Sequence, residues 1–223
     1  MGSDASRVVV FTGPSLHPCE AATLLDATFR PPIKRGDLDA LLVSRPDAVG
    51  IIDGEFYQSL AISPKEVLAL LETGVAVYGA ASMGALRAVE LEPYGMIGAG
   101  SVFRLFRRGV LDCDDEVALS YCKETWRAVS EPLVNTRYGL RCAVRKGVLT
   151  PIEATRIVAE LRPSYFPERT RELTLRVARE VAGADRARAL GNLLAMEAHN
   201  VKGRDARRLL QRMRRDLGRG AFA

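Results

Sequence analysis

The chain has 223 residues, of which 48% are hydrophobic and 26% are charged. This composition is typical of a folded globular protein and argues against extended disorder. No uncharged apolar run approaches the roughly 20 residues of a membrane-spanning helix, and the first residues lack the apolar core of a secretory signal. We therefore expect a cytoplasmic protein that does not enter a membrane.

The net charge of +5 is unevenly distributed along the chain. Residues 1–150 carry 16 basic and 18 acidic side chains, whereas residues 151–223 carry 16 basic and 9 acidic ones. The arginines between residues 204 and 219 fall on several helix faces without interleaved aromatic residues, so a solvated or partner-facing helix is favoured over a nucleic-acid-binding one. The four cysteines form no C-x-x-C pair, which predicts neither a zinc site nor a disulfide framework.

The first 80 residues alternate between short apolar runs and helical segments. Buried strands are predicted at residues 8–11, 48–52 and 75–78, and each is followed within two residues by glycine. Helices are predicted at residues 19–27, 37–43, 65–71 and 84–92. The two prolines at residues 31 and 32 predict a loop over residues 30–35. Short strands that alternate with helices predict a parallel sheet covered on both faces.

From residue 133 onward the pattern is helical, and the residues between 94 and 131 show no clear periodicity. Helices are predicted at residues 133–146, 151–161, 169–182, 185–199 and 205–217. The sequence thus predicts an α/β fold. Residues 1–130 would form a parallel sheet flanked by helices, and residues 131–223 an all-helical, arginine-rich region.

The most informative segment is a predicted strand, a run of small residues and a predicted helix over residues 75–91. Residues 80–84 read AASMG, which is close to the G-x-S-x-G nucleophile elbow. In such a turn Ser82 would project above the carboxyl end of the sheet, where the N–H groups of Met83 and Gly84 would stabilise an oxyanion. Two alternatives remain open: Ser82 caps the following helix, or the helix N-terminus binds an anion.

A serine nucleophile needs a base, and the chain offers three candidates. His17 follows the first predicted strand, and His199 lies near the end of a late helix. Lys65 lies in the first turn of a predicted helix whose start, Ser63 with Glu66, fits a capping box. The helix dipole there disfavours a positive charge, and a neutral amine can accept a serine proton. The structural alternative is a solvated lysine at a helix start.

Other polar residues follow predicted strands and would lie at the same edge of the sheet. Asp53 and Gly54 end the second predicted strand, so Asp53 would orient Lys65 or hold a backbone turn. Ser15 would line the same crevice or serve a turn. The acidic residues Asp112, Asp114, Asp115 and Glu116 lack the ligand spacing of a calcium loop, which favours an acidic turn at a helix N-terminus or ion pairs with arginines over a metal site.

Several segments between residues 8 and 145 resemble, in order, the TfuA-like family, whose members accompany YcaO enzymes in thioamide formation on peptide backbones. The most specific match is GAASMGALRAVEL at residues 79–91. The others are FTGPSL (11–16), PPIKRGD (31–37), IIDGEF (51–56), KEVL (65–68), YGMIGAG (94–100), DDEVA (114–118) and SEPLVNTR (130–137).

The resemblance implies a hydrolase-like acyl-transfer site in which Ser82 and Lys65 act as a pair, without metal, nucleotide or other cofactor. It implies release of sulfide from a thiocarboxylated ThiS-type sulfur carrier protein. The sulfide would serve a YcaO enzyme that thioamidates a ribosomally made peptide or protein. Arg87 and the helix N-termini would supply positive potential for the anionic thiocarboxylate. Pro64 departs from the polar residue expected before the lysine. The alternative is a non-catalytic recruiter that docks substrate or carrier onto the YcaO enzyme.

Overall fold

A computed structural model of the chain describes residues 8–56, 61–196 and 199–218. Its contacts divide the chain into two compact units, one formed by residues 1–114 with 202–223 and the other by residues 115–201. This division differs from the expected one at residue 130, because the last helix packs with the N-terminal sheet and not with the other C-terminal helices.

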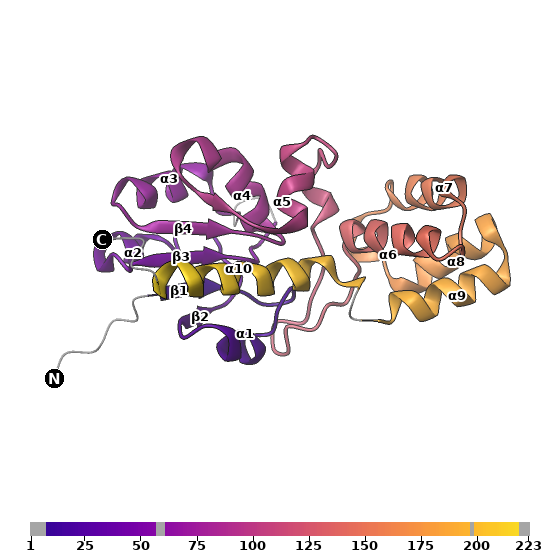
Figure 1. Ribbon diagram of the computed structural model, residues 1–223, viewed down its shortest axis with the longest axis horizontal. Coiled ribbons are helices and arrows are strands. Elements are labelled where there is room, and N and C mark those ends of the chain that lie inside the picture. Colours follow the sequence, from indigo (N-terminus) through magenta and orange to yellow (C-terminus); the bar gives the residue numbers. More distant parts are fainter. Residues whose placement is uncertain (1–7, 57–60, 197–198, 219–223) are drawn as a thin grey trace. The chain divides into compact units, whose positions relative to one another are not determined.

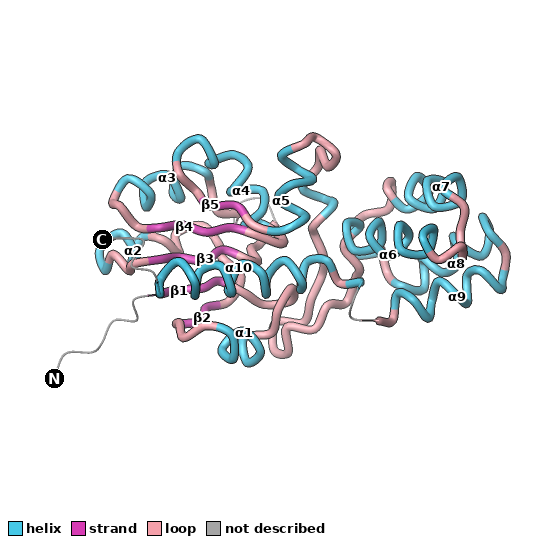
Figure 2. The backbone as a smooth tube through the Cα atoms, viewed as in Figure 1, coloured by secondary structure: helices cyan, strands magenta, loops and turns pink. Residues whose placement is uncertain are grey.

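The first unit is built on a five-stranded parallel sheet, as predicted (Figures 1 and 2). The strand order is β2-β1-β3-β4-β5. The short strands β2 and β5 were not predicted, because they contain few apolar residues and are defined by pairing with their neighbours. The strands are β1 (Val8–Phe11), β2 (Thr28–Arg30), β3 (Ala48–Ile51), β4 (Ala76–Gly79) and β5 (Ile97–Gly98).

Helices cover both faces of this sheet, which explains why its central strands are apolar throughout. Side chains alternate along a strand, so Val10 and Tyr78 face one layer, where α1 and α10 share their apolar core. On the other face, α2, α3, α4 and α5 pack side by side in that order. The helices are α1 (Pro18–Leu24), α2 (Asp39–Ser44), α3 (Pro64–Glu72), α4 (Met83–Leu91), α5 (Gly100–Arg107) and α10 (Val201–Gly218).

Helix α10 belongs to the sheet because it carries a narrow apolar stripe among its many arginines. Ala206, Leu209, Leu210 and Met213 follow the i, i+3, i+4, i+7 spacing of one helix face and are all fully buried. The Sδ atom of Met213 would lie 2.9 Å from a Cβ placed on Gly50 of β3, so the helix lies almost on the sheet backbone. Most of its arginines lie on the remaining faces, whereas Lys202 and Asp205 of the same helix are buried.

The second unit is helical and has its own core. It contains α6 (Leu133–Arg145), α7 (Pro151–Leu161), α8 (Arg171–Ala182) and α9 (Ala184–Leu194), of which α6 packs against both α7 and α9. Residues such as Leu140, Ile157 and Leu190 are buried together in this core. A capping box at Thr150 and Glu153 begins α7, and Thr170 caps α8. The predicted helices of this region are thus present, with boundaries shifted by a few residues.

Among the helices of the described segments, we find none whose length and apolar character would suit it to crossing a membrane.

Helix α5 is capped by a residue that lies about a hundred positions away in the sequence. Its own N-cap residue, Ala99, has no side-chain acceptor, and the buried Asp205 of α10 accepts a hydrogen bond from the Val102 N–H at 2.7 Å. Burial raises the pKa of the Asp205 carboxyl, although the bonds from the helix N–H groups act in the opposite direction. The cap joins α5 to α10 within the first unit.

Replacing this cap tests its contribution to stability. Asp205→Ala leaves buried N–H groups of α5 unpaired and should lower the free energy of unfolding by about 1–3 kcal/mol. Asp205→Asn keeps an acceptor oxygen and should lose less, since burial already disfavours the charge that it removes. Urea unfolding followed by far-UV circular dichroism measures both changes. An alanine variant as stable as the wild type would contradict the role of the cap.

Candidate functional site

The candidate site lies at the carboxyl edge of the sheet, where the strand order reverses. The chain passes from β1 to β2 on one side and continues from β3 to β4 and β5 on the other. Doubly wound sheets form a ligand crevice outside the strands at such a switch point. Ser15 follows β1, Asp53 and Gly54 follow β3, and Ser82 follows β4. The fold therefore brings these predicted residues to one edge of the sheet.

Asp53 organises the turn that follows β1. Its carboxylate is 2% exposed and accepts hydrogen bonds from the N–H groups of Gly13 at 3.0 Å and Ser15 at 2.9 Å. The Ser15 hydroxyl donates to the second carboxylate oxygen at 2.5 Å. Of the two roles considered for Asp53, the structure shows that of holding a backbone turn, and Lys65 is not among its partners. The carboxylate thus links the end of β3 to the turn that follows β1.

The turn between β4 and α4 is strained at the residue before Ser82. Ala81 has a φ of 66°, a left-handed conformation that is uncommon for a residue with a Cβ. The Ser82 N–H donates to the Ala80 carbonyl at 2.8 Å, which closes a γ-turn around Ala81. Backbone strain of this kind persists only where the surroundings enforce it, and it is concentrated at functional sites.

Ser82 occupies the N-cap position of α4 without acting as a cap through its side chain. Its hydroxyl accepts no hydrogen bond from the first turn of the helix, and the residue is 2% exposed. Helix capping, the structural alternative for this serine, therefore does not explain it. The strained turn therefore holds Ser82 in a conformation that side-chain capping of α4 does not require.

Glycine is required at the start of α4 because the helix lies directly on the end of β3. A Cβ on Gly84 would lie 1.7 Å from the Ile51 carbonyl oxygen. The Gly84 N–H donates to the Ile52 carbonyl at 3.3 Å, so it is engaged in closing the turn. This corrects the expected oxyanion role of Gly84. The Met83 N–H stands at the first helical position, where an N–H has no partner within the helix.

A second close contact joins the end of β3 to the same turn. A Cβ on Gly54 would lie 2.7 Å from the Met83 Cγ, and Gly54 also forms an isolated parallel bridge with Ile33. Gly54 therefore permits close packing of two segments at the carboxyl edge. The structure assigns it this packing role.

Lys65 lies at the predicted place in the chain but does not contact Ser82. The predicted capping box of α3 is present: Ser63 caps the helix and Glu66 accepts from the Ser63 N–H at 2.9 Å. Lys65 is exposed and forms no hydrogen bond or ion pair within the described residues. Since Ser82 is almost fully buried, the predicted pair is not assembled in this structure.

The carboxylate of Glu66 is held by the cap and not by the neighbouring lysine. Partial burial acts to raise its pKa, but hydrogen bonds from Gly36 and Ser63 outweigh this and lower it. The Gly36 N–H donates to Glu66 at 2.8 Å. Glu66 is thus an ionised capping residue, and no ion pair between it and Lys65 is present among the described residues.

Arg87 ties the start of α3 to α4. Its Nε donates to the Ile62 carbonyl at 2.9 Å, and its Nη1 lies 2.5 Å from the Glu90 carboxylate. Only 13% of the side chain is exposed. Because its charge is paired, Arg87 contributes less positive potential to a ligand than expected, and its evident role is structural.

The two histidines are engaged elsewhere. His17 is the N-cap of α1, and its Nδ1 accepts from the Cys19 N–H at 3.2 Å. His199 is buried in the second unit beside the Tyr138 ring, where burial lowers its pKa, with a further contribution from nearby cationic side chains. Neither histidine forms a hydrogen bond with Ser82 in the part of the chain that the structure describes.

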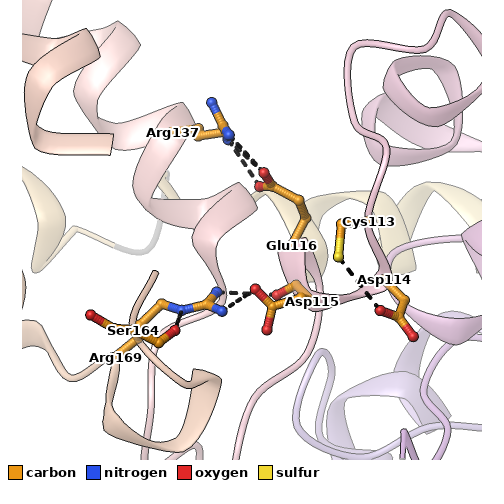
Figure 3. Close-up of polar contacts among 7 residues, drawn as sticks. All are labelled: Cys113, Asp114, Asp115, Glu116, Arg137, Ser164 and Arg169. Atoms are coloured by element: carbon orange, nitrogen blue, oxygen red, sulfur yellow. Dashed lines mark hydrogen bonds and ion pairs between the residues drawn. The ribbon is translucent and has the colours of Figure 1, made fainter. Parts of the chain in front are cut away.

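Two acidic residues of the cluster, Asp115 and Glu116, form ion pairs with arginines, as predicted (Figure 3). Glu116 is buried and receives a bidentate contact from Arg137, with the shortest distance 2.6 Å. Asp115 pairs with Arg169, which is 2% exposed and also donates to the Ser164 carbonyl at 2.9 Å. Within the described segments, no three His, Cys, Asp or Glu side chains gather as a metal site. The burial of Arg169 has no signal in the sequence.

These features define an open, doubly wound α/β protein whose carboxyl edge carries a buried serine on a strained strand-to-helix turn. The chain belongs to the TfuA-like family: the family model described as TfuA-like protein matches residues 53–170, just over half of the chain. The matched region begins at Asp53, includes Ser82 and ends after Arg169, so it spans parts of both units. A comparison with curated proteins gave no match.

Proposed function

We propose that this TfuA-like protein releases sulfide from a thiocarboxylated ThiS-type carrier protein and supplies it to a YcaO enzyme for peptide backbone thioamidation. The observation that carries the proposal is the γ-turn at Ala81, which holds Ser82 at the start of α4 without using its hydroxyl as a cap. Membership of the TfuA-like family supports the choice of substrate and partner.

In the proposed reaction Ser82 is the nucleophile and Lys65 is the base. Lys65 accepts the hydroxyl proton as Ser82 Oγ attacks the thiocarboxylate carbon of the carrier, and the Met83 N–H stabilises the oxyanion. The C–S bond then breaks, and the sulfur leaves with that proton as hydrosulfide. Water hydrolyses the resulting ester, which yields the carrier carboxylate, one proton and free Ser82.

Carrier binding has to complete this site, because Lys65 and Ser82 are not in contact. Bonds between a nucleophile and its base often tighten only in the substrate complex. The segment before α3 is already linked to the middle of α4 through Arg87 and the Ile62 carbonyl. A movement of the lysine side chain toward Ser82 is the step that the proposal requires.

Substitution of each residue tests the proposal directly. Ser82→Ala should abolish release of sulfide from a purified thiocarboxylated carrier, and Lys65→Ala should slow it by about 10²–10⁴-fold. A sulfide-reactive dye and the mass of the carrier report the product. The matched controls Ser44→Ala and Lys34→Ala change exposed residues of the same unit and should retain full activity. Full activity in both Ser82→Ala and Lys65→Ala would contradict the proposal.

A non-catalytic recruiter remains the second candidate, and the exposure of Lys65 away from any partner favours it. A recruiter would bind the carrier or the peptide and present it to the YcaO enzyme without turnover. Pull-down of the carrier and the YcaO enzyme with Ser82→Ala distinguishes the two functions. Retained binding with retained thioamidation supports recruitment, whereas retained binding with lost sulfide release supports catalysis.

A further inference from the structure

A pocket of about 520 Å³ lies in the first unit between α5 and α10, and five arginines line it. Two of these arginines lie three residues apart on α5. The other three lie on α10, separated by four and then three residues. The arginines of each helix therefore lie on one face of that helix. None of the residues of the candidate hydrolytic site lines this pocket. The arginines are Arg104, Arg107, Arg208, Arg212 and Arg215.

Acidic partners compensate only part of this charge. Arg107 lies 3.0 Å from Glu92, and Arg212 lies 3.4 Å from Asp216. Arg208 lies 3.9 Å from the carboxylate of Asp205, which also caps α5. Arg104 and Arg215 form no ion pair with a carboxylate in the described part of the chain. An arginine keeps its proton at neutral pH, so an anion that entered the pocket would meet the combined positive potential of these side chains.

Two of the guanidinium groups are held in place by neutral contacts. The Arg212 Nη1 donates to the Gly98 carbonyl at 3.3 Å, and the Arg107 guanidinium lies over the Phe103 ring at 5.5 Å from its centre. Contacts of this kind reduce the side-chain freedom that a ligand would otherwise have to remove. The pocket is therefore partly ordered for binding.

We propose that this arginine pocket binds a small molecule that carries two or more adjacent phosphate groups. Guanidinium groups match phosphate oxygens in bidentate pairs, and a single carboxylate would neutralise only one of the uncompensated arginines. The volume is within the roughly 300–1,000 Å³ range of small-molecule sites. The arginines converge on one concave volume instead of following an extended groove, which favours a compact ligand over a nucleic-acid strand. The proposal is independent of sulfide release.

Calorimetric titration of the full chain with inorganic tripolyphosphate tests the proposal. We expect saturable binding that weakens with salt and raises the melting temperature of the protein. Arg104→Gln and Arg215→Gln should each weaken binding by about tenfold, the effect of one lost charge-assisted contact. Arg214→Gln is the matched control, because Arg214 is exposed on the same helix and does not line the pocket, so the affinity should change by less than about twofold.

Further ligands identify the source of the phosphate groups. Tighter binding of ATP than of tripolyphosphate would support a nucleotide ligand, and equal binding would support recognition of the phosphates alone. Three results would overturn the proposal: no binding at low salt, an equal loss of affinity in Arg214→Gln, or tighter binding of a single-stranded oligonucleotide or a polyglutamate peptide than of tripolyphosphate. Far-UV circular dichroism of each variant establishes that it is folded.

Discussion

Gly84→Ala is expected to prevent the first unit from folding. The added methyl group would lie 1.7 Å from the Ile51 carbonyl oxygen, and both partners are backbone elements that cannot rotate away. Relief would require α4 to move off the sheet, which would break the Gly84–Ile52 hydrogen bond and the turn that carries Ser82. We expect a loss of more than about 4 kcal/mol in the free energy of unfolding, seen as insoluble or protease-sensitive protein.

The matched control is Gly191→Ala in the middle of α9. There the added methyl group would meet only the Leu175 side chain, at 3.4 Å, which is an ordinary contact. Alanine is the better helix former by about 1 kcal/mol, so this variant should be as stable as the wild type or slightly more stable. A soluble Gly84→Ala protein with an unchanged melting temperature would show that α4 does not pack on β3 as described.

Arg169→Ala is expected to destabilise the helical unit by about 3–5 kcal/mol. The guanidinium is buried and bonds the Asp115 carboxylate, the Asp115 carbonyl at 3.1 Å and the Ser164 carbonyl at 2.9 Å. Alanine would leave these acceptors without their donor and would create a cavity of the size of the lost side chain. The single tryptophan, Trp126, lies in the same unit, so its fluorescence during urea unfolding reports this change.

Arg188→Ala provides the comparison for an ion-paired arginine at the surface. Arg188 pairs with Asp185 at 3.5 Å one turn away, and both side chains are largely exposed. Such pairs contribute at most about 0.5 kcal/mol, so the unfolding curve should scarcely move. If Arg169→Ala and Arg188→Ala unfolded at the same urea concentration, the buried contacts of Arg169 would contribute no more to stability than an ion pair at the surface.

The central strands and the turn at Ser82 could be predicted because their signals are local. β1, β3 and β4 are covered on both faces, so each is a continuous apolar run bounded by glycine. The β4–α4 turn must pack against a neighbouring backbone, which restricts it to small residues around Ser82. The capping box at Ser63 is equally local, since both partners lie within one helical turn.

The relation between Lys65 and Ser82 could not be predicted in the same way. Lys65 lies in the first turn of α3 and Ser82 at the N-cap of α4, so their separation depends on how the two helices pack and on which way each side chain points. The sequence placed both at one edge of the sheet. It contained no information on the burial of Ser82 or the exposure of Lys65.

By itself, the sequence determined the parallel α/β sheet, the helical character of the C-terminal part and the strand-to-helix turn of small residues that carries Ser82. The tertiary structure alone decided that α10 returns to the sheet, that Asp205 caps α5 and that five arginines converge on one pocket. The physical reason is the sequence separation over which each kind of interaction acts. Hydrophobic period and turn chemistry act over a few residues, whereas these contacts join α5 to α10 across about a hundred residues and form only when the sheet buries the apolar stripe of α10.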